Sequence, residues 1–250
     1  MKPKILTMCS SRNRPTELIR MLKSFDATKT LDTEIVVHLS EDDKHLQEYI
    51  DNLRSGRWLY FIGAPIYMCE ALNYFSTKIF PGIEYYQEAN DDHIFHTPGW
   101  DKILIDAIEE HGLGWGVSYA DNHVDHMNTA CMMSGKSVRA VGYFAARQLR
   151  HHYADCQMRE LFLGVGQLMF LVKEAYIEHR CWHDTINGIG KLAPEDDNTR
   201  WVYSEEQDII GKKAMKEWVD NDQKNDIQKL KDAMLADGKK VDQSGKVIKI

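Results

Sequence analysis

The sequence has few cysteines and no long apolar run. Its five cysteines are scattered over 250 residues and form no C-x-x-C pair. This spacing argues against a disulfide framework and a structural zinc site, and it indicates a reducing compartment. No stretch approaches the ~18 consecutive apolar residues of a membrane span, and the apolar run after Met1–Lys4 is too short for a signal peptide. We therefore expect a cytoplasmic protein with no membrane span.

The sequence also lacks an excess of positive charge, internal repeats and low-complexity stretches. Its formal net charge is −7, so any nucleic-acid contact requires a local basic patch. Hydrophobic residues make up 43% of the chain and charged residues 28%, which is typical of a globular protein with a substantial core. The length fits one large α/β domain or two small ones.

Short apolar runs alternate with helical patterns in the first half of the chain. This alternation predicts a Rossmann-like, mostly parallel sheet with crossover helices. The expected strands cover residues 5–9, 34–39, 58–62 and 83–86. Beyond residue 122 the alternation becomes less regular. A further strand is expected before this point, at 115–119. After it we expect strands at 129–133 and 167–172, a continuation at 175–179, and a short helix at 136–142.

Two adjacent carboxylates follow the strand at 83–86, in the run Asn90-Asp91-Asp92. Thr97 and Pro98 predict the N-cap and first turn of the next helix. The aspartates thus lie at the carboxyl edge of the sheet, where open α/β sheets bind ligands. Adjacent aspartates repel each other, and a bound divalent cation offsets that repulsion. A solvated turn is the alternative, but the flanking strand and helix favour a metal site.

The first predicted strand ends in the run Ser10-Ser11-Arg12-Asn13-Arg14-Pro15. Hydroxyl groups, arginines and a nearby helix N-terminus suit a diphosphate, although an ordinary strand-to-helix turn explains the same pattern. The run resembles the opening of family-2-type glycosyltransferases of the GT-A fold, where this turn meets the nucleotide of the sugar donor. The resemblance implies that Ser10, Ser11, Arg12 and Arg14 bind the nucleotide-sugar, and it places Glu41 against the base or ribose.

The resemblance extends to residues 90–101, which look like the DXD-type motif of that superfamily with Asn90 in place of the first acid. It implies that Asp92 binds a divalent metal, Mn²⁺ or Mg²⁺, and that Asp91 faces the ribose or sugar. The metal would bridge the two phosphates of the donor and neutralise the departing diphosphate. Asp121, at the end of the strand at 115–119, is a further nucleotide-sugar candidate, and Trp100 is a weaker site candidate.

Residues 142–155 resemble the acceptor segment of the same enzymes. The resemblance implies that Asp155 is the general base that deprotonates the acceptor hydroxyl; the N-cap of a helix beginning near Cys156 is an alternative or additional role. His151 and His152 in this segment are weaker candidates. Residues 177–183 resemble the late histidine that returns to the metal, for which His179 is the first choice and His183 the second.

The resemblance covers about residues 4–185. We expect a GT-A domain at 1–202, with its nucleotide-sugar half at about 1–122 and its acceptor half at about 123–202. A helical C-terminal extension with a small hairpin is expected at 203–250, where Ser204 predicts a helix cap and Gly238 the end of the last helix. The fold class is therefore α/β, with a mixed, mostly parallel central sheet flanked by helices.

The implied function is metal-dependent transfer of a sugar from a nucleotide-diphospho-sugar to a hydroxyl of a glycan or protein, with inversion if Asp155 is the base. A hydroxymethylated DNA base, as in phage-type enzymes, is a less favoured acceptor because of the negative net charge. A sugar-phosphate nucleotidyltransferase is a rival, although the Gly-rich loop usual in that family is missing. A non-catalytic nucleotide-sugar-binding module is the alternative from another class.

Overall fold

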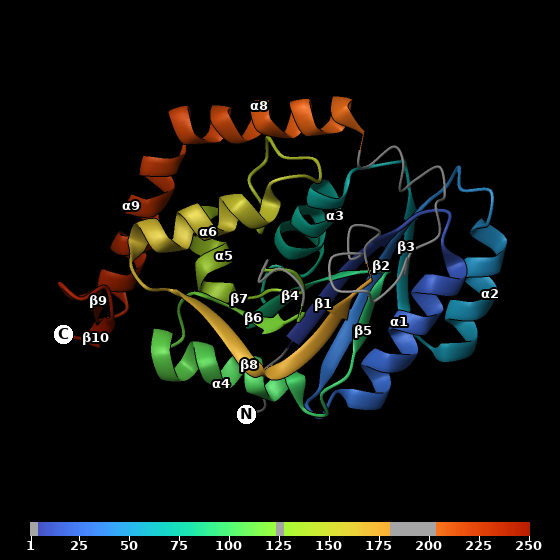
Figure 1. Cartoon of the computed structure of the whole chain (residues 1–250), viewed down its shortest axis with the longest axis horizontal. Coiled ribbons are helices and arrows are strands. Elements are labelled where there is room, and N and C mark those ends of the chain that lie inside the picture. The colour runs from blue at the N-terminus through green and yellow to red at the C-terminus, as the bar shows by residue number, and fades with distance from the viewer. Residues whose placement is uncertain (1–4, 124–127, 181–203) are drawn as a thin grey trace.

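The computed structural model describes residues 5–123, 128–180 and 204–250. Its centre is an eight-stranded sheet with the order β3-β2-β1-β4-β7-β6-β8-β5 and helices on both faces (Figure 1). The first four strands of the chain, β1 to β4, pair in parallel, as the sequence predicts. The elements of this half are β1 (Ile5–Ser11), α1 (Pro15–Thr28), β2 (Thr33–Ser40), α2 (Leu46–Gly56), β3 (Leu59–Gly63), α3 (Met68–Tyr74), the π-helical turn η1 (Phe75–Ile79) and β4 (Tyr85–Asn90).

The second half of the sheet is mixed. Strand β7 runs antiparallel to β4 and β6, whereas the long strand β8 runs parallel to β6 and antiparallel to β5. Figure 1 shows β8 bending as it passes from one partner to the other. The short strand β5 is absent from the sequence prediction. The elements of this half are β5 (His93–Phe95), α4 (Trp100–Gly112), β6 (Val117–Asp121), β7 (Met132–Ser134), α5 (Gly135–Val141), α6 (Ala154–Val165) and β8 (Met169–His179).

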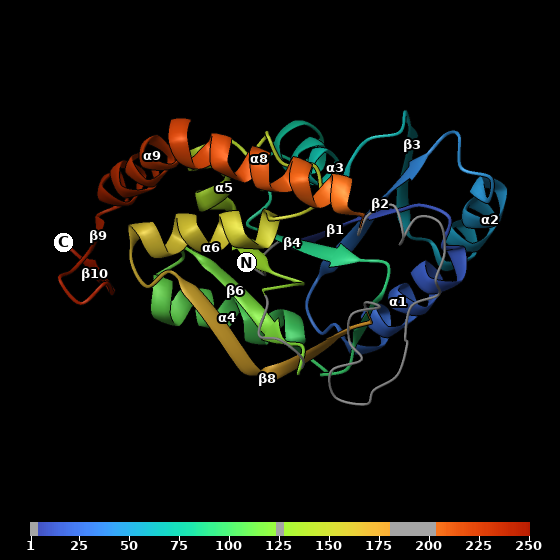
Figure 2. The same ribbon diagram turned by 45° about the horizontal axis from the view of Figure 1, so that its top comes forward.

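Two helices and a hairpin end the chain: α8 (Glu205–Asn221), α9 (Gln223–Ala236), β9 (Lys239–Val241) and β10 (Val247–Lys249). The Ser204 hydroxyl caps α8 by accepting a hydrogen bond from the N–H of Gln207 at 3.3 Å. Helix α9 packs on α5 and α6, and α8 lies across the same side of the molecule (Figure 2). Trp218 and Leu230 are fully buried in the core that these helices share with the sheet. This segment therefore belongs to the packed molecule.

The sheet separates two hydrophobic cores. Leu6 and Met8 of β1 face the core that contains α3, α5, α6, α8 and α9, whereas Ile5 and Cys9 face the core that contains α1, α2 and α4. Side chains of a strand alternate between the two faces, so a strand buried on both sides is apolar throughout. This double burial explains why the first strands were recognisable as continuous apolar runs.

Two helix starts differ from the prediction. Helix α4 begins at Trp100, after Gly99 with a φ of 77°. The Thr97 hydroxyl does not cap it and instead accepts a hydrogen bond from the N–H of Tyr176 at 2.9 Å, because β8 passes beside this loop. Helix α6 begins at Ala154, so Asp155 lies in its first turn and is not the N-cap.

In residues 5–123, 128–180 and 204–250, no helix has the length and apolar character needed to cross a membrane.

Candidate functional site

Asp91 is held at the carboxyl edge of the sheet, between β1 and β4. The two strands pair in parallel with Ser10 beside Asn90, so Ser11 and Asp91 follow next to each other. The Ser11 hydroxyl donates to Asp91 Oδ2 at 2.7 Å, and Arg14 Nη1 donates to Oδ1 at 3.2 Å. Burial raises the pKa of Asp91 to about 6, with Arg14 counteracting the rise and Asp92 adding to it. The contacts fix the direction of this carboxyl group.

The turn after β1 is tied to the turn after β2. Arg12 forms a bidentate pair with Asp42, at 2.5 and 3.0 Å. The backbone N–H of Asn13, a residue with a φ of 60°, donates to Asp43 Oδ2 at 2.8 Å. Ser10 is half-buried and Glu41 is exposed at the same edge of the sheet. The structure thus brings the candidates from the two turns together around the start of α1.

Asp92 lies beside two histidines from paired strands. His93 of β5 is directly opposite His179 of β8 in the antiparallel register, and their ring centroids are 4.9 Å apart. His179 Nε2 is 3.5 Å from Asp92 Oδ1. One side-chain atom from each of the three residues lies within 4.8 Å of the others. The tertiary structure therefore joins the predicted metal ligands Asp92 and His179, which are distant in sequence.

Two buried atoms of this cluster, Asp92 Oδ1 and His93 Nε2, have no hydrogen-bond partner within the described part of the chain. His93 Nδ1 accepts the backbone N–H of Asn90 at 3.1 Å, and burial lowers the pKa of His93 to about 3. A neutral imidazole that accepts at Nδ1 carries its proton on Nε2, which then cannot bind a metal. The residues thus fit a cation held by Asp92 and His179, with the N–H of His93 beside it.

The charge state of Asp92 agrees with this arrangement. Burial acts to raise the pKa of Asp92, but His179, His93 and Arg14 outweigh it and hold the pKa below its usual range. Arg14 Nη1 is 3.8 Å from Asp92 Oδ2, and the N–H of Arg180 donates to the Asp92 carbonyl at 3.0 Å. An ionised carboxylate with one free buried oxygen is a suitable ligand for a divalent cation.

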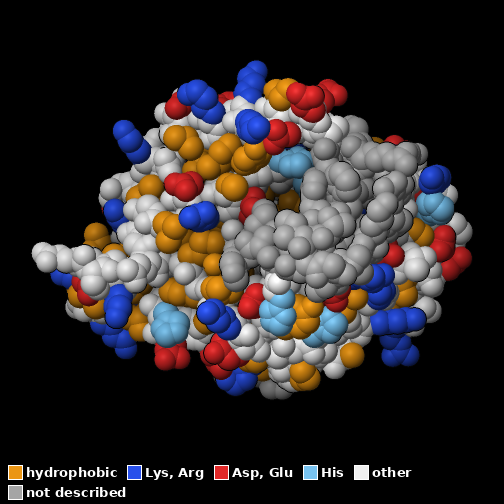
Figure 3. All heavy atoms as spheres, viewed as in Figure 1, with side chains coloured by type: hydrophobic (Ala, Val, Ile, Leu, Met, Phe, Trp, Pro, Cys, Tyr) orange, Lys and Arg blue, Asp and Glu red, His pale blue; other side chains and the backbone are white. Residues whose placement is uncertain are grey.

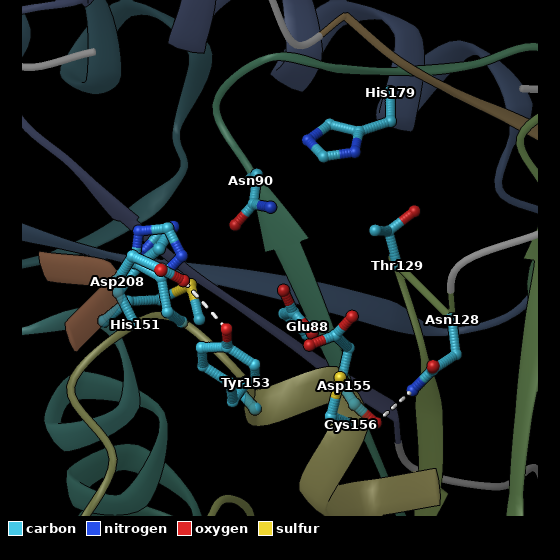
Figure 4. A pocket seen from close by; sticks show the side chains of 13 residues that line it. Glu88, Asn90, Asn128, Thr129, His151, Tyr153, Asp155, Cys156, His179 and Asp208 are labelled. Carbon is cyan, nitrogen blue, oxygen red and sulfur yellow. Dashed lines mark hydrogen bonds between the residues drawn. The ribbon is translucent and has the colours of Figure 1, made fainter. Parts of the chain in front are cut away.

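A cavity of about 240 Å³ opens next to the cluster. Figure 4 shows His179 at one side of it and the carboxyl groups of Glu88 and Asp155 together at another. In the space-filling view, histidine and acidic side chains lie beside a small hollow on this face (Figure 3). The described residues that line the cavity are Met68, Glu88, Asn90, Asn128, Thr129, His151, His152, Tyr153, Ala154, Asp155, Cys156, His179 and Asp208.

Glu88, inside the central strand β4, lines the cavity but was not among the site residues predicted from the sequence. Its side chain is 9% exposed, and the thiol of Cys131 donates to its Oε2 at 3.5 Å. Burial raises the pKa of Glu88 to about 7, the thiol counteracts the rise, and the nearby Asp155 adds to it. A signal was present in the sequence, because a charged residue within a buried strand requires a partner or a function. His93 was missed because the three-residue strand β5 has no recognisable pattern.

The C-terminal helix α8 forms part of the cavity wall. The Tyr153 hydroxyl donates to Asp208 Oδ1 at 2.8 Å, which joins α8 to the turn before α6. His151 and His152 lie in the same turn, and loss of water contact lowers the pKa of His151 to about 4. Both weaker histidine candidates therefore border the cavity, and His151 is neutral at pH 7.

Of the predicted site residues that the structure describes, those at the ends of β1, β2 and β4 lie outside the cavity lining, and so do Trp100 and Asp121. Trp100 is fully buried in the core formed with α1, 4.7 Å from Phe95 between ring centroids. Asp121 lies at the end of β6, where its Oδ1 accepts the N–H of His123 at 2.8 Å, and it is outside the cavity lining. His183 lies outside the described residues, as does the expected boundary near residue 202.

The strand order and the placement of the acidic motif at the edge of β4 define a GT-A fold. No family model matches the chain, and no curated protein matches its sequence. Solved structures do match. TarS 1–349 of S. aureus in complex with UDP matches with a TM-score of 0.55 and 10% identity, over 70% of this chain and 60% of the TarS chain. The alignment thus spans less than two thirds of that protein fragment.

Two further structures share the fold. Glucosyl-3-phosphoglycerate synthase from Mycobacterium tuberculosis, in complex with Mn²⁺, UDP and glucosyl-3-phosphoglycerate, matches with a TM-score of 0.54 and 11% identity, over 71% of this chain and 72% of the synthase. The mannosyltransferase PcManGT from Pyrobaculum calidifontis, in complex with GDP-Man and Mn²⁺, has a TM-score of 0.55 and 8% identity, over 94% of this chain and 75% of its own. At sequence identities this low, the structural matches show a shared fold and nothing more specific.

Proposed function

We propose that this protein transfers a sugar from a nucleotide-diphospho-sugar to an acceptor hydroxyl, using a divalent cation. The observation that carries the proposal is the placement of His179, which neighbours Asp92 at 3.5 Å and lines the same cavity as Asp155. A candidate metal ligand and a candidate base thus face one space large enough for a sugar. The three solved relatives named above are complexes with UDP or GDP-Man, two of them with Mn²⁺, which supports the same class of donor.

The donor would lie along the edge formed by the ends of β1 and β4. Asp91 is oriented there by Ser11 and Arg14, and it would accept hydrogen bonds from the ribose or sugar hydroxyls. Arg12 and the N-terminus of α1 lie in the same turn and would face the diphosphate. This assignment keeps the negative phosphates next to arginines and the neutral hydroxyls next to the carboxylate.

Asp92 and His179 would hold the cation, which would supply Lewis-acid stabilisation of the leaving diphosphate when bound. Imidazole is a better ligand for Mn²⁺ than for Mg²⁺, because Mg²⁺ demands oxygen ligands in near-ideal octahedral geometry. A site made of one carboxylate and one histidine therefore favours Mn²⁺. The His93 N–H would remain beside the ligands as a hydrogen-bond donor.

Asp155 would act as the general base. It lies in the first turn of α6, and Asn128 Nδ2 fixes this turn by donating to the Asp155 carbonyl at 3.1 Å. Its carboxylate would accept the proton of the acceptor hydroxyl as that oxygen attacks the anomeric carbon. A direct attack with the base on the acceptor side inverts the anomeric configuration.

The proposal is tested by a donor panel. The full chain is incubated with UDP-, GDP- and CMP-sugars in Mn²⁺, in Mg²⁺ and in chelator, and nucleotide release is measured with binding calorimetry alongside. We expect Mn²⁺-dependent binding and slow hydrolysis of one class of nucleotide-diphospho-sugar. Tight binding with no hydrolysis or transfer to a panel of glycan and protein acceptors would instead favour a non-catalytic binding module. Formation of a nucleotide-sugar from a sugar phosphate and a nucleoside triphosphate would favour a nucleotidyltransferase.

A further inference from the structure

The carboxyl group of Glu88 is aimed into the cavity from the centre of the sheet. Figure 4 shows it next to Asp155, below Asn90. The residue is 9% exposed, and within the described part of the chain the weak thiol donor of Cys131 is its side-chain hydrogen-bond partner, on Oε2. A buried carboxyl group with so few donors retains a need for hydrogen bonds. A ligand in the cavity is the group that can supply them.

The described lining of the cavity is acidic. It contains the carboxyl groups of Glu88, Asp155 and Asp208 and the imidazoles of His151, His152 and His179, and it contains no lysine and no arginine. The charge of Asp208 is offset by Lys212 at 2.7 Å and by the Tyr153 hydroxyl, so the uncompensated charge lies on the side of Glu88 and Asp155. Arg14 is engaged with Asp91 at the donor edge. The part of the cavity next to the base thus has a negative potential.

We propose that Glu88 is an acceptor-binding residue that selects acceptors carrying a hydroxyl or an ammonium group at this position over acceptors carrying a phosphate or a carboxylate. The inference deepens the proposed function and rests on it. A hydroxyl or an ammonium donates hydrogen bonds to the carboxyl group, whereas in the metal-free protein an anion would be repelled by Asp155 and by the ionised fraction of Glu88, and it would meet no lysine or arginine in the described lining. A neutral sugar or an amino sugar therefore fits the cavity, and a nucleic-acid acceptor does not.

The test uses three hexoses of different charge as probes: glucosamine, methyl glucoside and glucose 6-phosphate. Their dissociation constants for the full chain are measured by ligand-observed NMR without metal. We expect glucosamine to bind most tightly and glucose 6-phosphate to bind at least about tenfold more weakly, since unfavourable charge is the main source of such discrimination. Equal or tighter binding of glucose 6-phosphate to the wild-type protein would overturn the proposal, as would failure of all three probes to bind.

The Glu88→Gln variant keeps the shape of the side chain and removes its charge. We expect it to bring the dissociation constants of glucosamine and glucose 6-phosphate toward each other, whereas Glu84→Gln, an equal change of charge on an exposed residue four positions earlier, should leave their ratio as in the wild type. An unchanged ratio in Glu88→Gln would also overturn the assignment. If that variant does not fold, the wild-type order of the three probes still decides.

Calorimetry of UDP and GDP binding in Mn²⁺ on the same preparations separates the two proposals. Nucleotide binding with the wrong order of hexoses would reject the role of Glu88 and leave the proposed function intact. The expected order of hexoses without any nucleotide binding would reject the glycosyltransferase proposal and keep the charge selectivity of the cavity.

Discussion

His93 and His179 face each other across the antiparallel pair β5–β8, with ring centroids 4.9 Å apart. The two imidazoles have different hydrogen-bond environments, because His93 accepts a backbone hydrogen bond at Nδ1, from Asn90. That bond places the proton of the neutral His93 ring on Nε2. His179 is therefore the imidazole of this pair whose ring nitrogen can bind the proposed metal, and His93 presents its N–H beside Asp92.

His179→Ala should lower Mn²⁺ affinity at least tenfold in the presence of UDP or GDP, because it removes a proposed ligand. His93→Ala should lower the affinity less, since it removes only a neighbouring donor, but it should also reduce stability because the ring is fully buried. Calorimetric Mn²⁺ titrations together with thermal unfolding would separate these effects. Equal loss of Mn²⁺ affinity in both variants would identify His93 as a second ligand.

Asp92→Asn should abolish the rise in melting temperature that we expect Mn²⁺ and a nucleoside diphosphate together to produce in the wild-type protein. The rise is expected because a ligand that binds only the folded state stabilises it. Asp106→Asn, on the exposed face of α4 and paired with Lys102, provides the control and should retain the rise. A normal Mn²⁺-dependent rise in Asp92→Asn would remove Asp92 from the metal site.

Asp155→Asn should lower turnover by about 10²–10⁴-fold, the usual contribution of a general base. Donor affinity should be nearly unchanged, because in the proposed mechanism Asp155 contacts the acceptor and not the diphosphate. Asparagine preserves the size of the side chain, so the fold should persist. The measurement pairs calorimetric nucleotide affinity with the rate of transfer to an acceptor found in the panel. A parallel loss of affinity and turnover would assign a structural role to Asp155, and full turnover would exclude it as the base.

Glu88→Gln should change the pH dependence of stability in the metal-free protein. The pKa of Glu88 is raised from 4.5 to about 7, so the folded protein binds a proton that the unfolded chain releases. The stabilisation from this proton is fully present below pH 4.5 and is lost as the pH rises through 7. Between pH 4.5 and 8, the wild type should thus lose up to about 3 kcal/mol of unfolding free energy relative to the variant.

Urea unfolding of the wild type, Glu88→Gln and Glu84→Gln at several pH values checks this expectation. Glu84 is exposed, and its replacement should leave the pH profile parallel to that of the wild type. Parallel profiles for Glu88→Gln as well would show that Glu88 titrates normally in the folded protein.

Gly211→Ala should loosen the contact between α8 and the cavity wall. A Cβ atom at this position would lie 2.8 Å from His152 Cβ and from Tyr153 Cδ2, closer than real contacts allow. We expect a loss of about 1–3 kcal/mol in unfolding free energy, the usual cost of overpacking. Gly82→Ala, where no atom lies within 4 Å of the new Cβ, should have little effect. Equal stability of the two variants would show that α8 shifts without cost.

The sequence determined the parallel half of the sheet and the position of the acidic motif. Strands buried on both faces produce apolar runs, and amphipathic helices produce stripes, so the first four strands and their helices were predictable from local patterns. The position of Asp91 and Asp92 followed from the end of a strand. The cap of α8 was likewise local, because Ser204 bonds to a backbone group three residues ahead.

The tertiary structure decided which distant residues meet. His179 reaches Asp92 only because β8 bends from β6 to β5, and no local pattern encodes the partner of a strand. Helix α4 begins at Trp100 and not at the predicted Pro98, because the Thr97 hydroxyl accepts a hydrogen bond from β8 instead of capping the helix. Glu88 belongs to the cavity because residues of β4, α6 and α8 line the same space, with Asp155 near its buried carboxyl group. Such contacts depend on the packing of whole elements, which residue spacing alone does not specify.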